Sequence, residues 1–131
     1  MKGIDTNVLI RYLTQDDRTQ AAVAGQFLAR CTSDDPGYVN RVVLCELVWV
    51  LDRGYGYTRS QIAGVLDKLL RTGSLEIEDR AIAWEALATY AQGPADYSDC
   101  IIAAGNRARG CESTATLDAR AAKLAGMKLL S

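Results

Sequence analysis

Short strand-like segments alternate along this chain with longer segments of helical period. The clearest helical pattern follows residue 61, where apolar residues recur three and four positions apart: Ile62, Val65, Leu66, Leu69 and Leu70. The preceding Thr58-Arg59-Ser60-Gln61 has the form of a capping box, which predicts where that helix begins. Strands separated by helices form parallel pairs, because a helix supplies the crossover that a parallel pair needs. The sequence therefore predicts an α/β fold with a parallel sheet at its centre.

The predicted elements cover the chain without internal repeats or linkers. We expect strands at residues 3–5, 38–39, 75–77, 112–117 and 127–130. We expect helices at residues 7–13, 18–31, 41–51, 62–70, 81–91, 99–108 and 119–124. Asn7 or Thr6 is expected to cap the first helix and Asn40 the third, which Gly54 and Gly56 then break. The length of 131 residues suits a single domain spanning residues 1–131.

The composition excludes several classes of protein. The formal net charge is −1, so any contact with nucleic acid must be local or helped by a metal. The longest apolar run, residues 42–51, is about half a membrane span and contains Glu46. The N-terminal residues do not form an apolar signal segment. The four cysteines have no C-x-x-C spacing, which argues against a zinc knuckle; we expect reduced thiols and a cytoplasmic location.

The chain has no histidine, and this excludes several catalytic mechanisms. A Ser-His-Asp triad, a histidine-ligated zinc site and a pair of catalytic histidines are all impossible. A catalytic base must come from a carboxylate, Lys, Tyr, Cys or a metal-bound water.

Four acids with apolar neighbours are the best candidates for a site: Asp5, Glu46, Asp99 and Asp118. Asp5 ends the first predicted strand, Asp118 lies at the end of a later one, and Asp99 falls in the first turn of a predicted helix. Ligands of open parallel sheets bind beyond the carboxyl ends of the strands, where these acids are expected. Crowded carboxylates repel one another and raise their pKa values, and a divalent cation removes that penalty. Ligation by oxygen alone fits Mg²⁺ or Mn²⁺ better than Zn²⁺.

Each acid also has a purely structural interpretation. Asp5 and Asp118 can cap helices, and Asp99 can be stabilised by a helix dipole. Glu46 can lie on the polar edge of its helix or pair with Arg41 or Arg53. Hydroxyl and amide groups flank the acids and can orient a ligand carboxylate or simply cap a helix: Thr6, Asn7, Ser98 and Thr116. Asp96, three residues before Asp99, is an alternative site acid.

Four segments together resemble a PIN-domain ribonuclease of the VapC toxin type. They are Ile4-Asp5-Thr6-Asn7-Val8-Leu9, Glu46-Leu47-Val48-Trp49-Val50-Leu51, Ala95-Asp96-Tyr97-Ser98-Asp99-Cys100-Ile101-Ile102-Ala103-Ala104 and Thr116-Leu117-Asp118. Their order, spacing and the total length match over essentially the whole chain.

The resemblance implies a three-layer α/β/α fold with a central parallel sheet and an endoribonuclease that depends on Mg²⁺ or Mn²⁺. It implies a homodimer that an antitoxin from the same operon inhibits. The matching catalytic acids and metal ligands are Asp5, Glu46, Asp99 and Asp118. Asn7 and Thr116 match supporting polar positions, and Asp96 matches an extra acid that ranks below Asp99.

Three other functions stay open at this point. A PIN nuclease can act in RNA processing or on DNA, outside any toxin–antitoxin pair. A receiver-like signalling domain also binds Mg²⁺ at clustered acids, although Asp5 stands alone and Lys128 is followed by only three residues. A metal-free binding module can use all the acids as caps. Among the aromatics near residues 49–57, Trp49 is expected to pack in the core, and the others can anchor an interface.

Overall fold

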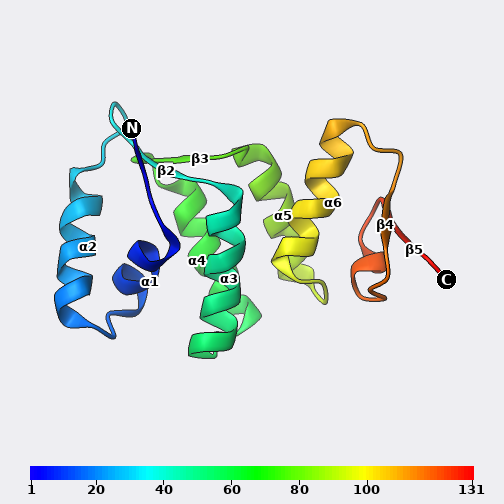
Figure 1. Cartoon of the computed structure of the whole chain (residues 1–131), viewed down its shortest axis with the longest axis horizontal. Coiled ribbons are helices and arrows are strands. Elements are labelled where there is room, and N and C mark those ends of the chain that lie inside the picture. Colours follow the sequence, from blue (N-terminus) through cyan, green and yellow to red (C-terminus); the bar gives the residue numbers. More distant parts are fainter.

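The computed structural model describes all 131 residues, and strands and helices alternate along it as expected for an α/β protein (Figure 1). The elements are β1 (Lys2–Gly3), α1 (Thr6–Thr14), α2 (Arg18–Arg30), β2 (Gly37–Val39), α3 (Arg41–Tyr55), α4 (Arg59–Arg71), β3 (Leu75–Ile77), α5 (Arg80–Gln92), α6 (Tyr97–Arg109), β4 (Thr114–Thr116), the 3₁₀ turn η1 (Ala121–Lys123) and β5 (Met127–Leu129). No helix is both long and apolar enough to cross a membrane.

All strand pairs are parallel, which confirms the predicted fold class. The strands form two sheets rather than one central sheet: β1-β2-β3 and β4-β5. Strand β1 has only two residues and pairs on one side, with Gly3 opposite Tyr38. Strand β4 instead pairs with β5, which follows it after the single turn η1, and closing so short a connection loses little chain entropy. In Figure 1 the β4-β5 sheet lies beyond α6, at the opposite end of the molecule from α1 and α2.

The core lies where α3 packs among α1, α4 and α6. Leu44, Leu47 and Leu51 of α3 are completely buried, and so is Val39 of β2. The three leucines recur at helical spacing, so one face of α3 is apolar and enclosed. Burying a leucine side chain stabilises a fold by about 1.5–3 kcal/mol, and α3 is therefore held in a fixed rotation about its axis.

Trp49 lies on the opposite face of α3, and its expected place in the core is wrong. Its side chain is 62% exposed. The buried positions of α3 include Val48 and Leu51, and the residue between them that the helical period turns outward is Trp49.

The helix ends agree with the sequence in some places and differ in others. Asn40 caps α3 by accepting from the amide of Val43 at 2.9 Å, and the capping box at Thr58 is present. Helix α3 continues through Gly54 and ends at Gly56, whose φ of 66° is in the left-handed region. Helix α1 begins at Thr6, so its N-cap is Asp5 and neither Asn7 nor Thr6. The predicted helix at residues 119–124 is only the turn η1.

Two glycines in different surroundings test how the sheet packs. A Cβ added at Gly37 of β2 would lie against the side chain of Ile4 and 3.2 Å from both Cys31 Sγ and Leu75 Cδ2. Gly37→Ala should therefore lower the free energy of unfolding by about 1–3 kcal/mol, as overpacking of a core does. Gly64 of α4 has nothing within 4 Å of such a Cβ. Gly64→Ala should raise the free energy by about 0.5–1 kcal/mol, because alanine favours helix. Urea unfolding checks both; equal stability of Gly37→Ala and wild type would contradict this packing.

Candidate metal centre

The first acidic group joins the end of β1 to the middle of α3. Asp5 is exposed and accepts a hydrogen bond from the amide of Thr6 at 2.7 Å. The hydroxyl of Thr6 donates to Glu46 Oε1 at 2.8 Å. Thr6 is only 8% exposed. The threonine thus holds both carboxylates at the packing of α1 on α3 while their outer oxygens face solvent.

The second acidic group lies at the start of α6 and in the loop after β4. Asp96 is the N-cap residue of α6, and its side chain makes no capping hydrogen bond. Asp99 is half-buried in the first turn. Its pKa is raised above the ordinary value, first by burial and then by the negative charges of Asp96 and Asp118, while Arg120 acts in the opposite direction. The second group is therefore crowded enough for its members to repel.

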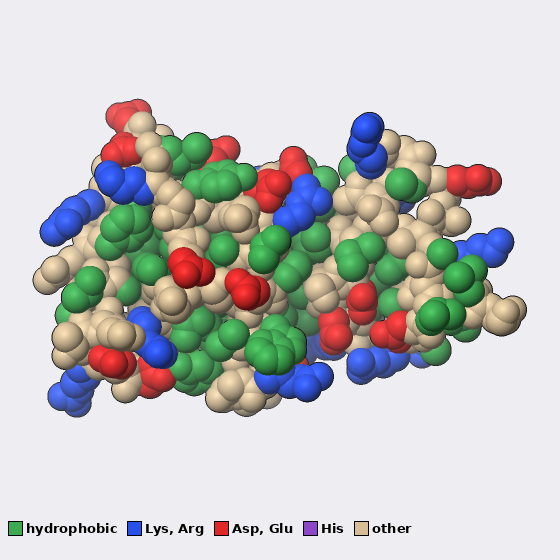
Figure 2. Space-filling model, viewed as in Figure 1, with side chains coloured by type: hydrophobic (Ala, Val, Ile, Leu, Met, Phe, Trp, Pro, Cys, Tyr) green, Lys and Arg blue, Asp and Glu red, His purple; other side chains and the backbone are tan.

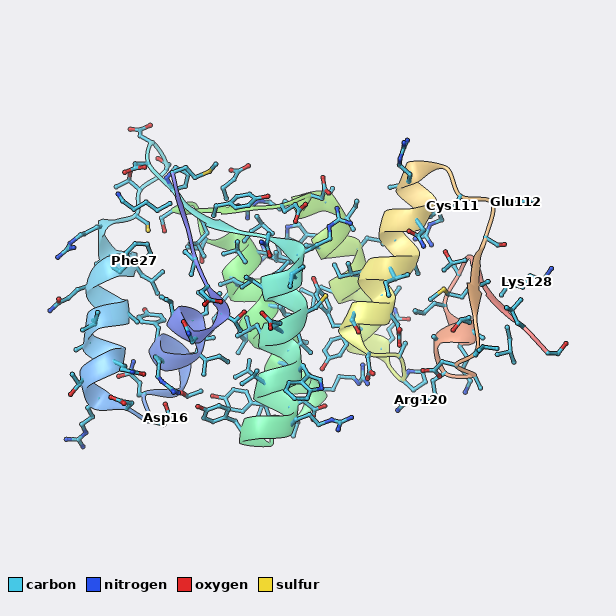
Figure 3. The ribbon with its side chains drawn as sticks, in the orientation of Figure 1. Asp16, Phe27, Cys111, Glu112, Arg120 and Lys128 are labelled. Atoms are coloured by element: carbon cyan, nitrogen blue, oxygen red, sulfur yellow. The ribbon has the colours of Figure 1, made fainter.

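Asp118 also has the structural role that the sequence left open. Its Oδ1 accepts from the amide of Arg120 at 2.8 Å, and its own amide donates to Thr116 Oγ1 at 3.1 Å. Thr116 therefore orients the loop that carries Asp118. In Figure 3 Arg120 lies below α6, on this loop, whereas Cys111 and Glu112 mark the connection that leads from α6 to β4.

Arg59 and Tyr97 fix the start of α6 and with it Asp96 and Asp99. The guanidinium of Arg59 donates to the carbonyls of Tyr90, Pro94 and Ala95 at 2.8–3.0 Å. It also lies 4.3 Å from the centre of the Tyr90 ring. Tyr97 is completely buried, and its hydroxyl donates to the carbonyl of Ala83 at 3.1 Å.

Sequence reasoning missed Arg59 as a positioning residue, because its partners are backbone carbonyls more than 30 residues away. It also missed Arg120. The position of that arginine, two residues after Asp118, was the available signal.

The structure brings the predicted acids into two groups and does not join them. No three acidic or cysteine side chains are close enough to hold one metal ion. Figure 2 shows acidic side chains gathered over the middle of this face and again toward the α6 end, with hydrophobic side chains between. The separation follows from the strand pairing: Asp118 follows β4, which pairs with β5 and not with β1. Asn7 and Ser98 are exposed beside the first and second group respectively.

The donor set suits a hard divalent cation. None of the five acids forms an ion pair: Asp5, Glu46, Asp96, Asp99 and Asp118. Arg41, one of the partners considered for Glu46, pairs instead with Glu78 and Asp79. Mg²⁺ keeps several waters and commonly uses only one or two protein carboxylates. Each group therefore offers enough oxygen ligands for such an ion, although neither is a closed cage.

The raised pKa of Asp99 predicts how stability changes when its charge is removed. A raised carboxyl pKa means that the folded state binds the proton more tightly, so ionisation above that pKa weakens the fold. Asp99→Asn should therefore melt at the wild-type temperature or slightly above it at pH 7. The difference should vanish at acidic pH, where Asp99 is already neutral. Melting curves at several pH values, without added metal, check this. A fall of about 4 °C or more, as when a cap worth about 1 kcal/mol is lost, would make Asp99 a structural residue.

Comparisons with known proteins agree with the arrangement of these segments. Residues 3–127 match the PIN domain family. A VapC ribonuclease of Aquifex aeolicus (strain VF5) is 24% identical over 124 residues, which cover 95% of this chain and 92% of that protein. No solved structure matches. The family match confirms the resemblance carried by the acidic segments and leaves the receiver-like alternative without support. This chain therefore belongs to the PIN domain family.

Proposed function

We propose that this protein is an endoribonuclease that depends on Mg²⁺ or Mn²⁺ and acts as the toxin of a toxin–antitoxin pair. The observation that carries the proposal is the set of carboxylates in the PIN segments, none of which forms an ion pair. The similarity to a VapC ribonuclease over most of both chains supports the choice of RNA as the substrate. A PIN nuclease of RNA processing, outside a toxin–antitoxin pair, is the alternative.

We assign each acidic residue a role in such a reaction. Asp5 and Glu46 would hold one ion, and Asp99 with Asp118 would hold a second if two are used. A bound ion polarises a phosphoryl oxygen and lowers the pKa of its water. Thr6 occupies Glu46 Oε1 and leaves Oε2 free to orient a water or a ligand. Phosphate would otherwise be repelled by the exposed acids, since the chain has no excess of basic residues.

We propose that an inhibitor of this nuclease binds in a pocket of the protein beside Asp5. A pocket of about 670 Å³ lies between α1 and α2, and Val8, Val23 and Phe27 are among its apolar residues. Asp5 and Asn7 also line this pocket. Its one cation, Arg11, is engaged by Gln20, Asp16 and Tyr55. The apolar residues suit an amphipathic segment of an antitoxin, and the free carboxylate suits a basic side chain at its end.

A homodimer belongs to the same proposal, because the resemblance implies one. Leu117, directly after β4, is 82% exposed, and Leu129 of β5 is 46% exposed. They are the apolar side chains that we propose for the interface.

Metal removal tests the nuclease. RNA cleavage should require Mg²⁺ or Mn²⁺ and stop with EDTA, and the product ends should carry 5′-phosphate and 3′-hydroxyl. Glu46→Gln should lower the rate by more than the roughly 10–100-fold that is typical of residues that only orient a metal ligand. Glu76→Gln is the matched control, since Glu76 is exposed on β3 and forms no ion pair. Cleavage that continues undiminished in EDTA would contradict a metal-dependent mechanism.

Competition tests the inhibitor. The cognate antitoxin should weaken Mn²⁺ binding, as measured by calorimetry. Replacing its basic residue near Asp5 by alanine should restore both Mn²⁺ binding and RNA cleavage, at an expected loss of about 2–5 kcal/mol in affinity. An antitoxin that binds equally well with and without saturating Mn²⁺, and still blocks cleavage after the change, would instead act by covering the RNA path.

A further inference from the structure

We infer that Trp49 and Arg53 form a subsite in which an unpaired base of the RNA stacks on the indole and a neighbouring phosphate contacts the guanidinium. The inference rests on the proposed nuclease function and assigns two further residues to its substrate. Both residues belong to α3, which also carries Glu46.

The two residues continue one exposed stripe of α3. Val42, Glu46, Trp49 and Arg53 follow at spacings of four, three and four, so they share one face of the helix. All four are exposed, and Val42 and Trp49 are each 62% exposed. Trp49 therefore lies within one turn of a proposed metal ligand and on the same side of the helix. A substrate positioned at Glu46 would extend over the indole.

A small pocket of about 70 Å³ connects Trp49 to the second acidic group. Its lining includes Trp49, Asp52 and Arg53 of α3, Arg59 of α4, and Asp96 and Ser98 at the start of α6. The indole thus borders a depression whose other wall carries a candidate site acid. The hydrophobic surface between the two acidic gatherings in Figure 2 agrees with this arrangement. A strand of RNA that passes between the two groups would cross Trp49.

The chemistry of the pocket favours a nucleotide over a purely apolar partner. Arg59 donates to three backbone carbonyls, so its charge stays in the pocket wall without a carboxylate partner. Arg53 is exposed and forms no ion pair, so it is free to contact a phosphate. An aromatic face beside arginines is the usual platform for single-stranded RNA, because every base has a face that can stack. With a net charge of −1, the chain needs such a local basic contact.

Tryptophan fluorescence can report the stacking directly. The chain has a second tryptophan, Trp84, against which Arg71 packs with its guanidinium 5.0 Å from the ring centre. In a Trp84→Phe variant, Trp49 is the sole source of indole emission. A single-stranded oligoribonucleotide, added with Mg²⁺ to this variant carrying Glu46→Gln as well so that it is cut only slowly, should quench this emission in a saturable way. The same sequence in a duplex should quench it far less, since its bases are already stacked.

Matched variants separate the base contact from the phosphate contact. Trp49→Ala should weaken binding of the oligoribonucleotide about ten-fold, a typical loss for one stacked base. Tyr12→Ala removes an aromatic that is 47% exposed on α1 and should leave the affinity unchanged. Arg53→Gln should lower the slope of log Kd against log salt by about 0.7, as when one single-strand phosphate contact is lost. Arg18→Gln, at another exposed arginine without an ion pair, should not change that slope.

Two results would overturn the inference. One is Trp49 emission that does not respond to the oligoribonucleotide. The other is a Trp49→Ala variant that binds RNA normally but sediments as a monomer where the wild type is a dimer, which would place Trp49 in an interface between copies. Cleavage without quenching would reject this subsite and keep the nuclease. Quenching without cleavage under any metal would keep the subsite and reject the nuclease.

Discussion

The rotation of α3 about its own axis determines which of its side chains lie in the core and which face solvent. The enclosed leucines, Leu44, Leu47 and Leu51, leave the helix only one way to sit against α1, α4 and α6. The opposite face must then point to solvent, and it carries Glu46 and Trp49. Core packing therefore aims an acid and an aromatic outward together. A polar substitution among the three leucines would disturb the surface as well as the interior.

The two acidic groups keep their negative charge because nearby arginines are bound to other partners. Arg41 is engaged by Glu78 and Asp79, and Arg59 by backbone carbonyls. The carboxylates of the two acidic groups thus form no ion pair with the protein's own cations, and Arg120 is the one cation that lowers the pKa of Asp99. Such an arrangement weakens an isolated fold, and it is retained where a ligand supplies the missing charge. A cation bound by these acids, as proposed, would therefore link the stability of the protein to its affinity for that cation.

Local features were predictable from the sequence, and long-range ones were not. The cap at Asn40, the capping box at Thr58 and the strand Leu75–Ile77 depend on neighbouring residues, and all three are present. Gly54 did not end α3, because the helix penalty of one glycine is small and Tyr55 beyond it packs against the core. The helical period of α3 alone would have predicted that Trp49 faces solvent. The prediction was wrong because it relied on the tendency of large aromatic residues to be buried.

The division of the acids into two groups could not be predicted, since it depends on which strands pair. No local residue pattern states that β4 pairs with β5 and leaves one edge of β1 open. Asp5 with Glu46, and Asp99 with Asp118, are each placed by packing between segments that are distant in sequence. The four acids do not form one metal centre in this structure, and their role as metal ligands stays a prediction.

The β4-β5 sheet has a consequence for how the second acidic group behaves over time. Neither of its two strands of three residues has a buried residue, and η1 contributes only one, Ala121. A segment with so few buried contacts opens at a lower free energy than the core around α3, so its amides should exchange with solvent hydrogen early. Asp118 is carried by this segment. Asp118 should therefore lie near Asp99 only while β4 and β5 are paired. A contact that stabilises this pairing would also keep the negative charge of Asp118 beside Asp99.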